Sequence, residues 1–130
     1  MADTERITIN MNAVELGKID LLVEEGHYSN RTDFIRSAIR AQLEKHSVDV
    51  QQSVVRHSYA IGAMGYDRAE FERLKARGQK LKISVVGLLH LPADLPAELA
   101  DEVIETIKVN GIFQASEAVK AALKSSGKLK

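Results

Sequence analysis

Polar and apolar residues alternate near the start of the chain, where Arg6, Thr8 and Asn10 are separated by large apolar residues. Side chains of a β-strand alternate between its two faces, so this segment predicts a strand with one polar and one apolar face. In the major groove of DNA, Arg can bind guanine, Asn can bind adenine, and Thr can contact several base edges. The three polar residues are therefore candidates for reading DNA.

The predicted strand has no partner within hairpin reach, because helix-like sequence follows it at once. A lone strand leaves its backbone N–H and C=O groups unpaired and is not stable. Antiparallel pairing with the same strand of a second copy would satisfy these groups, so we expect a homodimer. The resulting two-stranded ribbon fits the major groove of double-stranded DNA. An ordinary sheet edge is the alternative interpretation.

Two helices are expected after the strand. The first begins near Asn12, a good cap residue, and ends at Gly26, which suits the left-handed C-terminal position. The second begins at Ser29 or Asn30, and Asp33 lies in its first turn, where a carboxylate suits the helix dipole. The backbone N–H groups at the start of this second helix form an anion site at which a DNA phosphate could bind.

The strand and the passage from Gly26 to Arg40 resemble the ribbon-helix-helix family, most closely CopG-type regulators and the N-terminal domain of NikR regulators. Strand, first helix, glycine turn and capped second helix arrive in the family order. The resemblance implies an intertwined α+β dimer and a cytoplasmic, sequence-specific regulator of transcription that acts as a repressor. Carried over by position, it assigns base reading to Arg6, Thr8 and Asn10, and phosphate binding to Ser29, Asn30 and Arg31.

Charge gives less support to DNA binding than the motif does. The whole chain has a net charge of zero, and residues 1–46 hold six Lys or Arg against eight Asp or Glu. Because DNA affinity depends on neutralising phosphates, this balance argues against tight non-specific binding by one dimer. We interpret Arg36 and Arg40, one turn apart, as a charged outer helix face. Several dimers are expected to act together.

The second half of the chain contains a repeat. An Ile-x-x-x-Gly pattern followed by a large apolar residue starts at Ile61, Ile83 and Ile107. Each unit precedes a helical pattern, and these span Asp67–Arg77, Pro96–Glu105 and Ser116–Ser125. Strands that alternate with helices at this period predict three βα units over residues 58–125, as a small parallel sheet or a short solenoid.

The predicted organisation therefore has three parts. Residues 1–50 form the ribbon-helix-helix domain, residues 51–57 a linker or helix extension, and residues 58–130 a small α/β domain of about three βα repeat units. We expect this last domain to assemble higher oligomers or to bind a protein partner through residues 58–125. An antitoxin that binds its toxin with this half is the main alternative. A small-molecule sensor, and an interaction protein that does not bind DNA, also stay open.

Other chemistry is poorly represented in the chain. It has no cysteine, and its four histidines lack a metal-binding spacing, so no metal site and no cofactor are expected. No nucleophile lies in a recognisable catalytic motif, so we do not expect an enzyme. The polar N-terminus lacks a signal-peptide pattern, and the apolar run Val85–Leu89 is too short to span a membrane.

Overall fold

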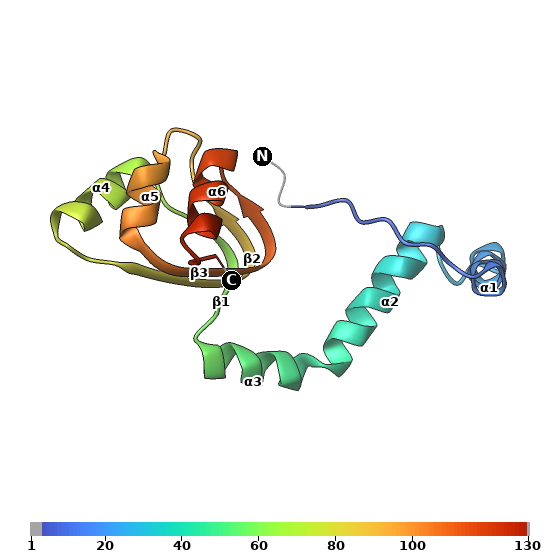
Figure 1. Cartoon of the computed structure of the whole chain (residues 1–130). Helices are drawn as coiled ribbons and strands as arrows, with labels where there is room; N and C mark the ends of the chain where they lie inside the picture. Colours follow the sequence, from blue (N-terminus) through green and yellow to red (C-terminus); the bar gives the residue numbers. More distant parts are fainter. Residues whose placement is uncertain (1–3, 130) are drawn as a thin grey trace. The chain divides into compact units, whose positions relative to one another are not determined.

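The computed structural model describes residues 4–129 and divides the chain into two compact units, Arg6–Ser53 and Val54–Lys130. Helices α1 (Ala13–Glu24) and α2 (Arg31–Lys45) make up most of the first unit. The boundary between the two units falls within helix α3 (Ser47–His57), which is labelled in Figure 1. Residues 51–57, expected as a linker or a helix extension, are thus helical.

The ends of α1 form as the residue types predict. The side-chain oxygen of Asn12 accepts hydrogen bonds from the N–H groups of Val14, at 2.8 Å, and Glu15, at 3.3 Å. At the other end Gly26 has φ 87°, a left-handed conformation that costs glycine little. The N–H of His27 then donates to the carbonyl of Leu22 at 2.9 Å, which ends the helix.

The strand expected over residues 6–12 is not formed in the single chain, which has no regular secondary structure from residue 4 to Asn12. Asn12 nevertheless has an extended backbone, with φ −62° and ψ 140°. A strand is defined by hydrogen bonds to a neighbouring strand, and this segment was expected to find its neighbour in a second copy. The single chain contains no such neighbour, so the pairing of this segment with a second copy stays a prediction.

The second unit is built from three βα pairs, as the repeat predicted. Its elements are β1 (Ala60–Gly65), α4 (Arg68–Ala76), β2 (Leu81–His90), α5 (Ala97–Val103), β3 (Ile104–Gln114) and α6 (Glu117–Ser125). The strands form one parallel sheet in the order β1-β2-β3. Figure 1 shows α4, α5 and α6 together on one face of this sheet.

Local signals fixed most of these helix boundaries. Asp67 and Glu70 form a complete capping box at the start of α4, and Ser116 caps α6 through a 3.2 Å bond from the N–H of Val119. Helix α5 is shorter than the predicted Pro96–Glu105, because Ile104 already has the extended backbone that opens β3. The helix prediction was wrong over its last two residues for that reason.

The core of this unit lies between the sheet and its helices. Strand residues alternate between faces, and the inward ones meet the apolar side of α4, α5 and α6. The buried members are Phe71, Ile83, Val85, Leu89, Leu91, Leu95, Leu99, Ala100, Val103, Ile104, Ile107, Val119 and Leu123. None of them comes from residues before Phe71, so the unit carries its own core.

Three glycines lie side by side across the sheet, and the sequence pattern located only two of them. Gly87 pairs with Gly111, as the repeat implied, but its partner on β1 is Gly62 and not Gly65. Their φ angles are 123° at Gly62, 138° at Gly87 and 129° at Gly111. A Cβ on Gly87 would lie 2.2 Å from the carbonyl oxygen of Gly62, and one on Gly111 would lie 2.0 Å from that of Gly87. We call Gly62, Gly87 and Gly111 the glycine row.

A methyl group in the middle of the glycine row should destabilise the second unit. Gly87→Ala combines positive-φ strain, on the order of 1–3 kcal/mol, with a backbone clash that neither strand can relieve by a side-chain rotation. Gly62→Ala is the matched control, because its Cβ would meet nothing within 4 Å and only the strain applies. Urea unfolding followed by circular dichroism should give a midpoint for Gly87→Ala that lies well below the midpoint for Gly62→Ala. Equal midpoints would contradict this account of the row.

Candidate nucleic-acid interface

The Arg6–Ser53 unit has almost no core of its own. All of its residues are described, and only Ile19, at 4% exposure, is buried. Large apolar side chains on the leading segment and on both helices face outward, with Ile7 75%, Ile39 46% and Leu43 60% exposed. A unit of this size cannot fold stably without burying more apolar surface than this. The exposed side chains therefore mark a surface for a partner.

The same unit contains an apolar hollow. It has a volume of about 260 Å³ and is lined by Met11, Glu15, Lys18, Ile19, Leu22 and Phe34. Phe34 is held in place by an edge-to-face contact with Tyr28, whose ring centroid lies 5.0 Å away. The hollow is thus lined by the end of the leading segment and by both helices.

The three candidate base readers are placed on the leading segment and point to no other part of the unit. Arg6, Thr8 and Asn10 are all exposed, and none makes a hydrogen bond or ion pair with any other residue of 4–129. They are thus free of competing partners within the described chain.

Helix α2 begins with a cap residue, as the sequence predicted. Asn30 is the cap, since its side-chain oxygen accepts a 2.8 Å hydrogen bond from the N–H of Asp33. The carboxylate of Asp33 in turn accepts a 2.9 Å bond from the N–H of Ser29. Reciprocal bonds of this kind fix the entry of the chain into the helix. Ser29 and Asn30 remain exposed at this end.

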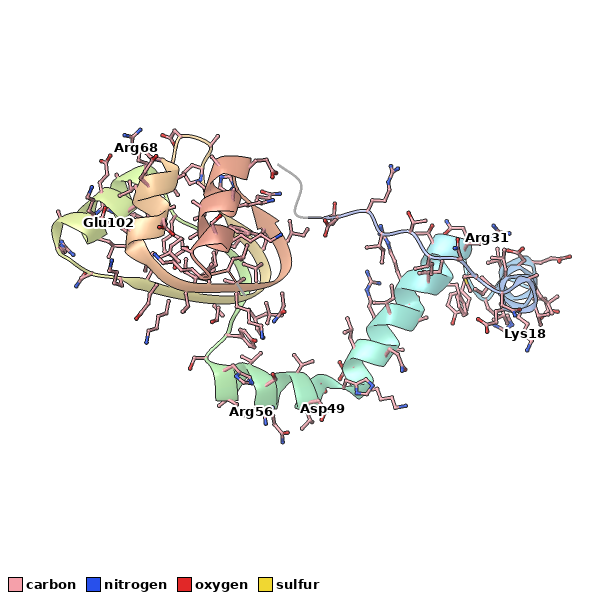
Figure 2. All side chains as sticks on the ribbon, in the orientation of Figure 1. Lys18, Arg31, Asp49, Arg56, Arg68 and Glu102 are labelled. Atoms are coloured by element: carbon pink, nitrogen blue, oxygen red, sulfur yellow. The ribbon has the colours of Figure 1, made fainter. Side chains whose placement is uncertain are left out.

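Arg31, a candidate phosphate ligand, is held by a residue that the sequence analysis did not single out. Its Nε and Nη2 atoms donate to the two carboxylate oxygens of Asp20, both at 2.8 Å. This bidentate ion pair ties α1 to α2, and Figure 2 shows Arg31 at the junction of the two helices. The hydrogen bond from Arg31 holds the pKa of Asp20 below its ordinary value of 3.8. In the sequence, the opposite charges of Asp20 and Arg31 on either side of the Gly26 turn were the feature that could have predicted this ion pair.

Two further arginines lie beside the helix start. A hollow of about 380 Å³ is lined by Ser29, Asn30, Thr32, Asp33, Arg36 and Arg40. Arg36 and Arg40 were interpreted as a plain outer face, yet their side chains line the same hollow as the capping residues. Neither makes an ion pair with any residue between 4 and 129. The signal for this cluster was the spacing of four residues from Thr32 to Arg36 and from Arg36 to Arg40, which places all three on one side of α2.

The described residues offer little for other chemistry. Between residues 4 and 129, no three His, Asp or Glu side chains are grouped so as to hold a metal ion. Within the same range, no helix is both long enough and apolar enough to cross a membrane.

Two helices joined by a left-handed glycine turn, preceded by an extended segment with an alternating pattern, define a DNA-binding class of protein. The chain belongs to the ribbon-helix-helix transcriptional regulator family, whose sequence model matches residues 2–120. It is also similar to the transcriptional regulator CdrS of Halobacterium salinarum (strain ATCC 700922 / JCM 11081 / NRC-1). The two are 33% identical over 43 residues, which cover 33% of this chain and 78% of the relative. No solved structure matches the chain.

The ion pair between Asp20 and Arg31 should be visible in a titration. Arg31→Gln removes the hydrogen bond that lowers the pKa of Asp20, so this pKa should rise toward 3.8. Because the folded pKa is lowered, the pair stabilises the unit at pH values above 3.8 and ceases to do so as the pH falls through the folded pKa. Carboxyl NMR shifts measure this directly. Arg36→Gln is the control, and an Asp20 pKa that moves equally in both variants would refute the assignment.

Proposed function

We propose that the chain is a sequence-specific repressor that reads the major groove with an antiparallel ribbon formed by residues 6–12 of two copies. The observation that carries this proposal is the single buried side chain, Ile19, of the Arg6–Ser53 unit. In a two-fold dimer, Ile7 and Ile9 would cover the apolar hollow between the helices of both copies. Arg6, Thr8 and Asn10, on the opposite face of the ribbon, would meet the base edges.

Phosphate contacts would position the ribbon. The N–H groups of Ser29 and Asp33 are already bonded to side chains, so a phosphate oxygen would bind the remaining N–H groups in the first turn of α2. Arg36 and Arg40 line the same hollow and carry charges that no described acid neutralises. Arg31 was assigned this role by position, but its guanidinium is bound to Asp20, so it would contribute mainly by fixing the helix pair. Two copies would double every one of these contacts.

The Val54–Lys130 unit would assemble such dimers into larger units. It has a core of its own, which suits a permanent assembly domain. An antitoxin is the competing proposal, because antitoxins of this family use the same ribbon and bind a toxin with the C-terminal half. Their partner-binding tails are often disordered until bound, whereas this unit is folded by its own side chains, and this favours the repressor. A small basic protein that co-purifies with the chain would reverse that preference.

Substitutions in the ribbon should remove base discrimination. Arg6→Ala and Asn10→Ala are each expected to cost about 1–3 kcal/mol of preference for the operator over random DNA. Arg36→Ala should instead weaken both DNAs alike and flatten the salt dependence, because a phosphate contact carries no sequence information. Arg73→Ala, an exposed arginine on α4, is the control. Fluorescence anisotropy at several salt concentrations measures all four, after the operator is isolated by genomic pull-down. Unchanged selectivity in both ribbon variants would defeat the proposal.

Assembly can be tested by light scattering. The full chain is expected to contain more protomers than a fragment of residues 1–50, which should remain a dimer. Equal protomer numbers would refute the assembly role of the second unit, but they would not contradict the proposed ribbon dimer. A monomeric fragment at high micromolar concentration would instead count against the ribbon dimer itself.

A further inference from the structure

The ion pair between Asp20 and Arg31 does more than orient two helices. The two residues lie eleven positions apart, and their side chains are 48% and 56% exposed, respectively. Water and salt screen a pair this exposed, so its contribution to stability is small. The helix pair is also held by apolar packing, since the ring of Tyr28 meets that of Phe34 edge to face. The ion pair, however, has an electrostatic effect that apolar packing lacks.

The pair occupies the donors of Arg31 that would otherwise bind a phosphate. Its Nε and Nη2 atoms donate to both carboxylate oxygens of Asp20, each at 2.8 Å. A guanidinium offers the same two parallel donors to a phosphate as to a carboxylate, so the two acceptors compete for one position. The hydrogen bond from Arg31 also holds the pKa of Asp20 below 3.8, so the carboxylate is charged at neutral pH. The donors of Arg31 are then occupied from within the chain.

Arg31 also lies where the proposed function puts a DNA phosphate. It is the first residue of α2, and the cap oxygen of Asn30 already accepts from the N–H of Asp33. The N–H groups of Arg31 and Thr32 remain in the first turn, and a phosphate bound to them would lie beside the side chain of Arg31. Asp20 brings a negative charge to this helix start, where the helix dipole favours an anion. It therefore competes with a phosphate both for the guanidinium and for the local field.

We propose that Asp20 lowers the affinity of the chain for DNA of any sequence, because its carboxylate holds the guanidinium of Arg31 away from the phosphates. The inference rests on the proposed function, since it requires the start of α2 to approach DNA. Asp20 itself touches no DNA and acts only through Arg31. Phosphate contacts carry no sequence information, so the affinity changes while the base preference does not. The balance of six Lys or Arg against eight Asp or Glu in residues 1–46 acts in the same direction.

Asp20→Asn in the full chain tests the proposal, because the amide keeps the shape of the side chain and removes its charge. Affinity for random duplex DNA should rise about ten-fold at about 50 mM salt, and the slope of log affinity against log salt should steepen by roughly 1.8 per dimer, as one more arginine per copy neutralises a phosphate. A role confined to orienting the helices predicts the opposite sign, since a loosened helix pair would bind DNA more weakly. Fluorescence anisotropy measures both quantities.

Two comparisons separate the release of Arg31 from the simple loss of a negative charge. Glu24→Gln removes an exposed acid four residues along α1 that forms no ion pair with any residue of 4–129, so it should raise the affinity slightly and leave the slope unchanged. In an Arg31→Gln background, Asp20→Asn should have no more effect than Glu24→Gln. Circular dichroism confirms that the variants fold. Equal slopes for Asp20→Asn and Glu24→Gln, or a full effect of Asp20→Asn without Arg31, would overturn the inference.

The Nε–H signal of Arg31 in NMR spectra gives a second readout, which the unsubstituted chain alone can provide. This signal should stay in place when random DNA is added to the unsubstituted chain, because Asp20 holds the group, and should shift in Asp20→Asn. A shift of the same size in the unsubstituted chain would show that phosphate displaces Asp20 freely, and would overturn the inference.

Failure of this inference can be told from failure of the proposed function. The ribbon is tested by operator selectivity in Arg6→Ala and Asn10→Ala, which does not involve Asp20. Selectivity lost in those variants, with no gain of affinity in Asp20→Asn, would refute the role of Asp20 alone. A gain of affinity in Asp20→Asn, with selectivity unchanged in the ribbon variants, would support the role of Asp20 and refute the ribbon.

Discussion

The DNA-binding unit depends on one constraint, which is that Ile19 is its only buried side chain. Two helices and an extended segment enclose too little apolar surface to offset the conformational entropy of folding. In the proposed dimer a second copy would complete this core, and folding, dimer formation and the creation of the DNA-reading surface would be one event. The stability of the unit would depend on protomer concentration, and any DNA site it reads would share its two-fold symmetry.

The second unit buries enough apolar surface within one chain. Its helices close a core against one side of a parallel sheet, and this core needs no second chain. One chain thus combines a unit that leaves most of its large apolar side chains exposed with a unit that buries its own. The proposed assembly of dimers through the second unit suits a chain with zero net charge, because DNA occupancy would then rise through neighbouring dimers rather than through tighter phosphate binding.

Sequence reasoning succeeded where a residue acts on its immediate neighbours. Helix ends are fixed by hydrogen bonds to the backbone within a few residues, as at Asn12, Gly26 and Ser116. The residue types at these positions are the ones that predict a helix end. It failed where the partner is distant along the chain, because finding the ion pair of Asp20 with Arg31 requires knowing how the two helices pack against each other. The pairing of the leading segment with a second chain stays a prediction. The glycine row was misaligned on β1 because a three-residue offset leaves a plausible Ile-x-x-x-Gly pattern, and only the register decides between them.

The glycine row has a consequence for how the sheet reaches a unique register during folding. Alternation of apolar and polar residues prevents a slip of one residue, since that would turn every side chain to the wrong face, but it tolerates a slip of two. With β3 shifted by two residues, the position opposite Gly87 would hold Val109 or Phe113. Its Cβ would then fall almost on the carbonyl oxygen that Gly111 accommodates. Backbone shape thus excludes the misfolded sheets that hydrophobic patterning alone would accept.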